Sequence, residues 1–180
     1  MRGAALAAAG CLAALAGAGP ACAEAVQVVA RAHVGDWRIE CVRTQDQDRL
    51  CEMFAVALVD GAPGSRDVIL QVGPSHDGLG QEVAIVAEDL GFDDAPAGIR
   101  IDDREILDLA EPSPDITCAG RICQIDGVSA GMIVAAAGLG QRLVLTGIDG
   151  RGEPVEAVFD LGDFSEGYRL WRQMQAEHRP

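Results

Sequence analysis

Residues 37–59 read WRIECVRTQDQDRLCEMFAVALV, and this stretch decides the fold. In its first part Trp37, Ile39 and Cys41 alternate with residues of the opposite face, which is the two-residue period of a half-buried β-strand. A polar turn follows, and the apolar run Leu50–Val59 predicts a longer return strand. The stretch therefore predicts a β-hairpin.

Short apolar segments continue on the C-terminal side of this hairpin, separated by clusters of glycine, proline, aspartate and serine. Many short strands with turn signals between them predict an all-β sandwich or barrel. A final strand pair is expected around the turn at 149–152. The expected strands cover 67–72, 82–86, 98–101, 105–109, 116–118, 123–125, 142–148 and 153–161.

Two helices are expected within this β-rich pattern. Residues 128–137 are rich in alanine and are followed by Gly138, which predicts a short helix with a glycine stop. A terminal helix is expected after a cap at Asp163 or Ser165.

The terminal helix carries aromatic residues at spacings of four and three, so they share one face. This face could dock a partner, but an amphipathic terminal helix usually buries its own stripe against the domain. We therefore expect the stripe to cover one edge or open end of the sheet. Its residues are Phe164, Tyr168 and Trp171.

The N-terminus predicts export. Residues 1–23 contain one early positive charge at Arg2, an apolar run over Ala4–Ala16, and small residues before an expected cleavage after Ala23. The apolar run is shorter than the roughly 20 residues that a spanning helix needs. The mature chain is thus expected to have no transmembrane segment.

The rest of the chain is expected to form one domain. We assign residues 24–33 to an N-terminal extension and residues 34–176 to the domain itself. The stretch 24–32 is among the residues most prone to disorder.

Four of the six cysteines remain after cleavage, an even number in a chain sent to an oxidising compartment. Cys41 and Cys51 flank the hairpin turn, and Cys118 and Cys123 flank a second turn, so we expect a local disulfide in each place. Free thiols or a metal site are the alternative. Neither pair has the C-x-x-C spacing typical of catalytic dithiols, which favours structural disulfides.

The charge of the chain excludes one class of partner. Its formal net charge is −14, and its positive side chains are all arginine with no clusters. Phosphate binding needs clustered positive charge, so nucleic acid is not expected as a partner. The acidity is expected to keep the protein soluble.

The sequence indicates no catalytic, cofactor-binding or metal-binding residues. It has no G-x-S-x-G, P-loop or H-E-x-x-H motif, and the pair Gly138 and Gly140 lacks the third glycine of a dinucleotide site. We interpret the remaining polar candidates as loop residues. These are Ser75, His76 and Asp77 and the acidic pairs at 93–94 and 102–103. The histidines His33, His76 and His178 are scattered far from the cysteine pairs, which disfavours a zinc site.

The segments 35–41 (GDWRIEC) and 50–54 (LCEMF), the spacing of Cys118 and Cys123, and the closing helix at 164–171 together resemble the invasion-associated locus B family of bacterial exported proteins. The similarity extends over about 34–173.

The resemblance implies an immunoglobulin-like β-sandwich with one short inserted helix and a C-terminal helix. It also implies a periplasmic or cell-envelope location and, in pathogens, a contribution to entry into host cells. No enzymatic activity or cofactor is characteristic of the family. The four cysteines correspond to two intradomain disulfides, and Trp37 corresponds to a core aromatic. The absence of lysine departs from the basic members of the family.

We therefore expect an exported, non-enzymatic envelope protein that binds a protein partner in the envelope or on a host cell. The alternative is a periplasmic thiol-disulfide enzyme, or a hydrolase that uses His33 or His76. A small-ligand binder is a third option, although aromatic residues form only 4% of the chain.

Overall fold

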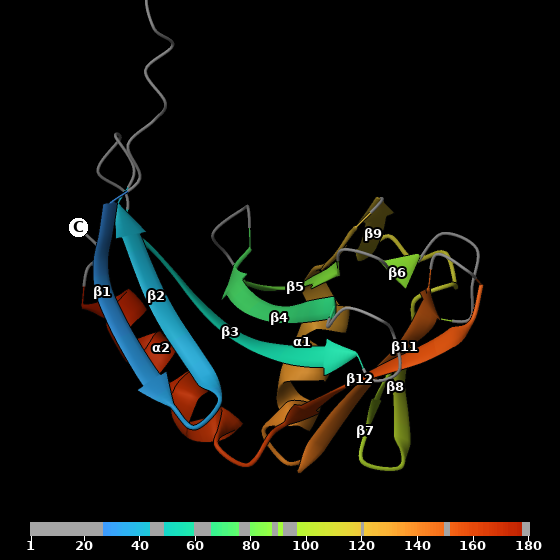
Figure 1. Ribbon diagram of the computed structural model, residues 1–180. Helices are drawn as coiled ribbons and strands as arrows, with labels where there is room; N and C mark the ends of the chain where they lie inside the picture. The colour runs from blue at the N-terminus through green and yellow to red at the C-terminus, as the bar shows by residue number, and fades with distance from the viewer. Residues whose placement is uncertain are drawn as a thin grey trace, which may run out of the picture.

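The computed structural model describes residues 27–43, 49–59, 66–75, 80–87, 90–91, 97–119, 121–149 and 152–177. These ranges hold a 12-stranded sheet and the helices α1 (Gly127–Ala137) and α2 (Phe164–Ala176), drawn in Figure 1. Neither described helix is long and apolar enough to cross a membrane. The strands are β1 (Gln27–Val34), β2 (Trp37–Arg43), β3 (Arg49–Val59), β4 (Arg66–Pro74), β5 (Gln81–Ala87), β6 (Leu90–Gly91), β7 (Gly98–Ile101), β8 (Arg104–Asp108), β9 (Ile116–Ala119), β10 (Ile122–Ile125), β11 (Arg142–Asp149) and β12 (Pro154–Asp160).

The described strands form one antiparallel sheet in the order β8-β7-β11-β12-β3-β4-β5-β10-β9. Strand β2 joins β3 and carries β1, while β6 joins β11. One edge of β3 pairs first with β2 and then, where Val59 lies opposite Ala157, with β12. The other edge pairs with β4. Strand β3 therefore joins a first half-sheet (β1–β5, β9 and β10) to a second half-sheet (β6–β8, β11 and β12).

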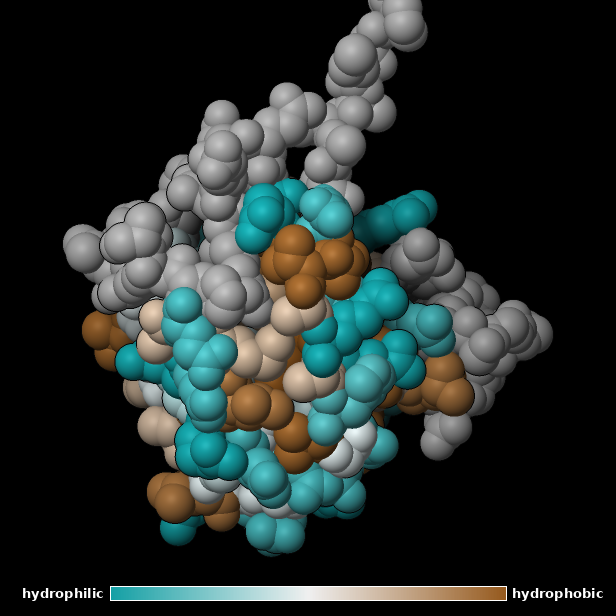
Figure 2. All heavy atoms as spheres, turned by 90° about the vertical axis from the view of Figure 1, so that its left-hand side faces the viewer, coloured by the Kyte–Doolittle hydropathy of each residue, from teal (hydrophilic) through white to brown (hydrophobic). Residues whose placement is uncertain are grey.

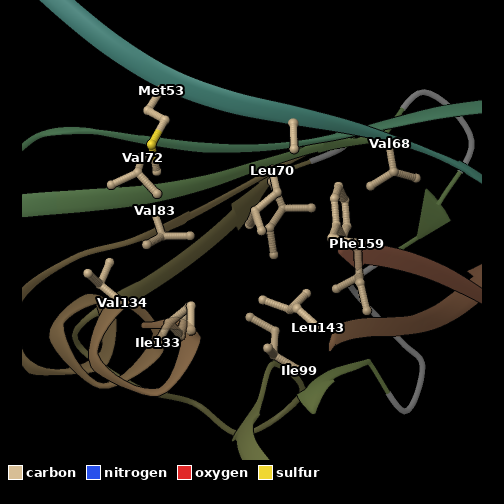
Figure 3. Packing of buried hydrophobic residues seen from close by; sticks show 14 of the residues in the cluster. Met53, Val68, Leu70, Val72, Val83, Ile99, Ile133, Val134, Leu143 and Phe159 are labelled. Atoms are coloured by element: carbon tan, nitrogen blue, oxygen red, sulfur yellow. The ribbon is translucent and has the colours of Figure 1, made fainter. Parts of the chain in front are cut away.

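The sheet curls so that the inner faces of the two half-sheets enclose the core. In Figure 3, Val68 and Leu70 of the first half-sheet point toward Leu143 and Phe159 of the second, and Ile133 of α1 fills one side. All five side chains are buried. The all-β class is therefore confirmed, with both helices packed on the strands.

The β2–β3 hairpin follows the predicted alternation. Trp37, Ile39 and Cys41 are fully buried, whereas Arg38 between them is exposed. The turn that connects β1 to β2 contains Gly35 at a φ of +55°, a left-handed conformation that glycine adopts without steric cost. The hairpin is thus held by the burial of every second residue.

Helix α2 packs on the inner face of this hairpin. The ring of Phe164 lies edge-on against Trp37 with centroids 4.9 Å apart, and Trp171 Nε1 donates to the carbonyl oxygen of Cys51 at 2.8 Å. Gly167 brings the helix close to the sheet, because a Cβ there would lie 3.2 Å from Met53 Sδ. The aromatic stripe is therefore packed against the domain as predicted, but it covers the inner face of the β2–β3 hairpin and not an edge or open end of the sheet.

Helix α1 is capped at its start by a side chain from outside the helix. Asp115 Oδ2 accepts hydrogen bonds from the backbone N–H groups of Val128 and Ser129 at 3.1 and 3.2 Å, so it satisfies donors that a helix start leaves open. The helix ends at Ala137, and the N–H of Gly138 donates to the carbonyl of Val134. The predicted glycine-stopped helix is confirmed.

The expectation of disorder over 24–32 is wrong from Gln27 onward. Residues Gln27–Val34 form β1, which pairs along β2 and ends with Val34 opposite Trp37. Val29 and Ala32 pack partly against the core, and this burial gives the strand a stability that its composition does not indicate. Strand β1 therefore covers most of the predicted N-terminal extension. The predicted signal peptide lies outside the described residues.

Trp37→Ala is expected to lower the free energy of unfolding by about 3–5 kcal/mol, because it leaves a cavity and removes the contact with Phe164. Urea denaturation followed by far-ultraviolet circular dichroism measures this change. Leu139→Ala is the control, because Leu139 is 89% exposed and should change the value by less than about 0.5 kcal/mol. Equal effects of the two variants would contradict the role of Trp37.

Candidate functional site

Both cysteine pairs bridge neighbouring antiparallel strands. Cys41 in β2 lies directly opposite Cys51 in β3, with their Cα atoms 3.9 Å apart. Cys118 in β9 lies opposite Cys123 in β10, with their Cα atoms 4.0 Å apart. The predicted local pairing is confirmed.

The two bridges differ in exposure. Cys41 and Cys51 are fully buried beneath α2, and Cys123 is also fully buried. Cys118 is half-buried on β9, which is the last strand at its end of the sheet. Thiol–disulfide exchange requires that a thiolate reach one of the sulfur atoms, so burial protects the first bridge from this reaction. Its surroundings are those of a structural disulfide.

Two of the polar loop candidates have structural roles. Ser75 Oγ accepts a hydrogen bond from the N–H of Gly80 at 2.8 Å and so helps to close the connection between β4 and β5. Asp102 has a φ of 53°, and its Oδ1 accepts from the N–H groups of Gln141 and Arg142 at 3.1 Å each. These contacts tie the β7–β8 turn to the start of β11.

The remaining candidates form no assembled site in the described part of the chain. His33 is an exposed residue of β1. Within the described ranges, no three His, Cys, Asp or Glu side chains are grouped so as to hold a metal ion. His76, Asp77, His178 and the acidic pair 93–94 lie outside the described residues.

A small hollow lies at the turn between β1 and β2. Its volume is about 90 Å³, which is well below the roughly 300 Å³ at which ligand pockets begin. Trp37 forms part of its wall and donates from Nε1 to the carbonyl oxygen of Asp160 at 3.2 Å. The hollow is too small to enclose a drug-sized ligand. Its lining consists of Gly35, Asp36, Trp37, Asp160 and Asp163.

A larger candidate surface is the outer face of β3, β4, β5 and β10, which is turned away from α1 (Figure 1). Cross-strand pairing places Val56 beside Ile69, Ile69 beside Val86, and Val86 beside Ile122. Val56 is 41% exposed and Ile122 is 48% exposed. Leu58 and Val158, which are exposed at the junction with β12, extend this surface. We call the whole surface the apolar patch. It comprises Val56, Leu58, Ile69, Val86, Ile122 and Val158.

A line of carboxylates crosses the same outer face, and we call Glu40, Glu52 and Glu82 the acidic row. Glu40 lies opposite Glu52 in the β2–β3 pair. Gly73 lies beside Glu52 and opposite Glu82, so no side chain separates the two carboxylates there. Arg31 pairs with Glu40 at 3.0 Å on the β1 side of the row.

Glu52 is a partly buried carboxyl group of this row. Its pKa is raised above the ordinary value of 4.5, mainly because partial burial disfavours the charged form. A hydrogen bond from Gln71 lowers the pKa, and repulsion from Glu40 raises it. The charge on Glu52 is therefore incompletely compensated within the domain.

The sequence-based search did not identify the apolar patch or the acidic row. A signal was present in the run 54–59, where apolar residues occupy both faces of β3 without alternation.

Figure 2 shows a different side of the molecule, toward β1, β2 and α2, where hydrophilic residues surround smaller groups of hydrophobic ones.

Replacing both Cys41 and Cys51 by alanine is expected to lower the free energy of unfolding by about 2–3 kcal/mol, because the unfolded chain regains the loop entropy that the bridge removes. Denaturant titration with and without a thiol reductant measures the effect. The reductant should destabilise the wild-type protein more than this variant, which retains only the Cys118–Cys123 bridge. An identical response of both proteins would contradict a stabilising bridge at this position.

Glu52→Gln is expected to stabilise the protein at neutral pH. A raised pKa means that the folded state holds the proton more tightly, so ionisation of Glu52 costs stability as the pH rises above 4.5 through the folded pKa. The gain in melting temperature over wild type should shrink below that range. Thermal unfolding at several pH values measures this, with the exposed Glu111→Gln as control. A gain that does not depend on pH would contradict the assignment.

The described geometry thus provides two structural disulfides and an outer sheet face with an apolar patch and an acidic row. No protein-family model, curated protein or solved structure matches this chain.

Proposed function

We propose that the protein is an exported, non-enzymatic module of the bacterial cell envelope, of the invasion-associated locus B type, which binds a protein partner or has a structural role there. In a pathogen this role would contribute to entry into host cells. The observation that carries the proposal is the placement of both cysteine pairs directly across neighbouring strands, with Cys41, Cys51 and Cys123 fully buried.

Export through the predicted signal at 1–23 fits this chemistry. Disulfides form and persist in oxidising compartments such as the periplasm, and thiols in the bacterial cytosol are kept reduced. Two bridges in one domain of this size therefore support an extracytoplasmic location.

The immunoglobulin-like sandwich belongs to the same proposal. The inner faces of the two half-sheets pack against each other across the core, as the layers of a sandwich do. We propose that the half-sheets correspond to the two layers, joined through β3, with α1 as the inserted helix and α2 as the closing helix.

A thiol-disulfide oxidoreductase is the second candidate function. One observation favours it, because Cys118 is half-buried on an outermost strand and is the most accessible of the four cysteines. A catalytic pair must exchange with an external thiol in the folded state.

Alkylation of the folded protein in the presence of a mild dithiol reductant separates the two functions. A structural role predicts that all four cysteines resist labelling until denaturant unfolds the chain, because exchange requires access to the sulfur atoms. Mass spectrometry identifies the labelled positions. Rapid labelling of Cys118 and Cys123 in the folded state would support the oxidoreductase instead.

Cell fractionation tests the location. The mature protein should be recovered from the periplasmic or envelope fraction with Glu24 as its first residue. Recovery of the uncleaved chain from the cytosol would contradict export.

A further inference from the structure

The apolar patch and the acidic row run side by side where both cross β3 and β5. Glu52 and Val56 are four positions apart in β3, and Glu82 and Val86 are four positions apart in β5. At about 3.3 Å per residue, the two features are separated by about 13 Å along each strand. The row between them contains the uncharged Phe54, Gln71 and Ala84. The surface therefore changes from apolar to anionic over a short distance.

The backbone of this face limits the shape of an occupant. The N–H and C=O groups of β4 are used in pairing with β3 on one edge and β5 on the other. An added strand needs a free sheet edge, so a partner on this face must bind through side chains. An α-helix is about 10–12 Å across with its side chains. A helix over the apolar patch can therefore reach the acidic row with long side chains on its flank.

The charges on this face indicate that a partner should carry positive charge. Glu52 and Glu82 lie in the central strands of the face, and the ion-paired Arg31 and the exposed Arg38 lie toward its β1–β2 end. Partial burial, and to a lesser extent repulsion by Glu40, make the charge of Glu52 costly, and a cation placed beside it would relieve that cost. With a net charge of −14, a second copy of the chain or an anionic membrane would be repelled.

We propose that this outer face binds an amphipathic α-helix of a partner protein, with its apolar stripe on the apolar patch and flanking arginine or lysine side chains at the acidic row. This inference rests on the proposed function as a binding module and names the chemistry of its partner. The exposed Leu58 and Val158 extend the contact toward β12.

The test uses the purified, disulfide-bonded mature chain and a synthetic helical peptide of leucine and arginine. Leucine occupies positions i, i+3, i+4 and i+7, and arginine flanks this stripe. A scrambled peptide of the same composition and a leucine–glutamate peptide are the controls, together with vesicles of phosphatidylglycerol. Fluorescence anisotropy at low salt measures binding, and NMR chemical-shift changes locate it. We expect only the amphipathic arginine peptide to bind tightly, with shifts on β3, β4, β5 and β10.

Variants separate the two parts of the surface. Val56→Ser with Ile122→Ser should weaken binding at least tenfold, and Glu52→Gln with Glu82→Gln should weaken it about fivefold and reduce its dependence on salt. The altered residues are exposed or half-buried, so the variants should fold, and circular dichroism checks this. Leu139→Ser, on a different part of the surface, is the matched control and should change binding less than twofold.

Several results would overturn the inference. These are equal binding of the scrambled or glutamate peptide, preferential binding to the vesicles, shifts confined to other strands, or equal weakening by Leu139→Ser. Self-association that Val56→Ser abolishes would instead assign the face to a second copy. Export and thiol resistance are measured without the peptide, so a failure here leaves the proposed function standing and removes only the helix partner.

Discussion

The contact between α2 and the β2–β3 hairpin binds the C-terminal helix to the first long hairpin of the described chain. Trp171 donates to the carbonyl of Cys51, and Phe164 packs edge-on against Trp37. Trp37 in turn donates to the carbonyl of Asp160 at the end of β12. These contacts connect segments more than a hundred residues apart in sequence and keep the largest buried side chains out of water.

Local signals were sufficient to predict most elements of this architecture. The alternation of Trp37, Ile39 and Cys41 predicts a strand because only one face of that strand is buried. The same holds for the helix stop at Gly138 and for the local disulfides, because each involves residues close together in the chain. In such places, propensity, turn chemistry and packing all favour the same structure.

Features that arise from distant pairing could not be predicted in this way. Gln27–Val34 alternates only over 30–34, where Arg31 and His33 lie between apolar residues, and its pairing with β2 completes the strand. Asp115 accepts hydrogen bonds from the start of α1 because β9 and β10, which lie between them in the sequence, bring the two close together in space. The apolar patch is visible only once Val86 and Ile122 are known to be neighbours. Sequence spacing carries no information on which strand edges meet.

Strand β3 joins the two half-sheets, so the separation of one from the other breaks a pairing at its end. If the second half-sheet separated from the core, Val59 of β3 would lose its pairing with Ala157, and the backbone groups there would be left without the hydrogen bonds that they make in the sheet. Opening of the second half-sheet would therefore also free the last residue of β3. We expect the described strands to unfold together as one cooperative unit.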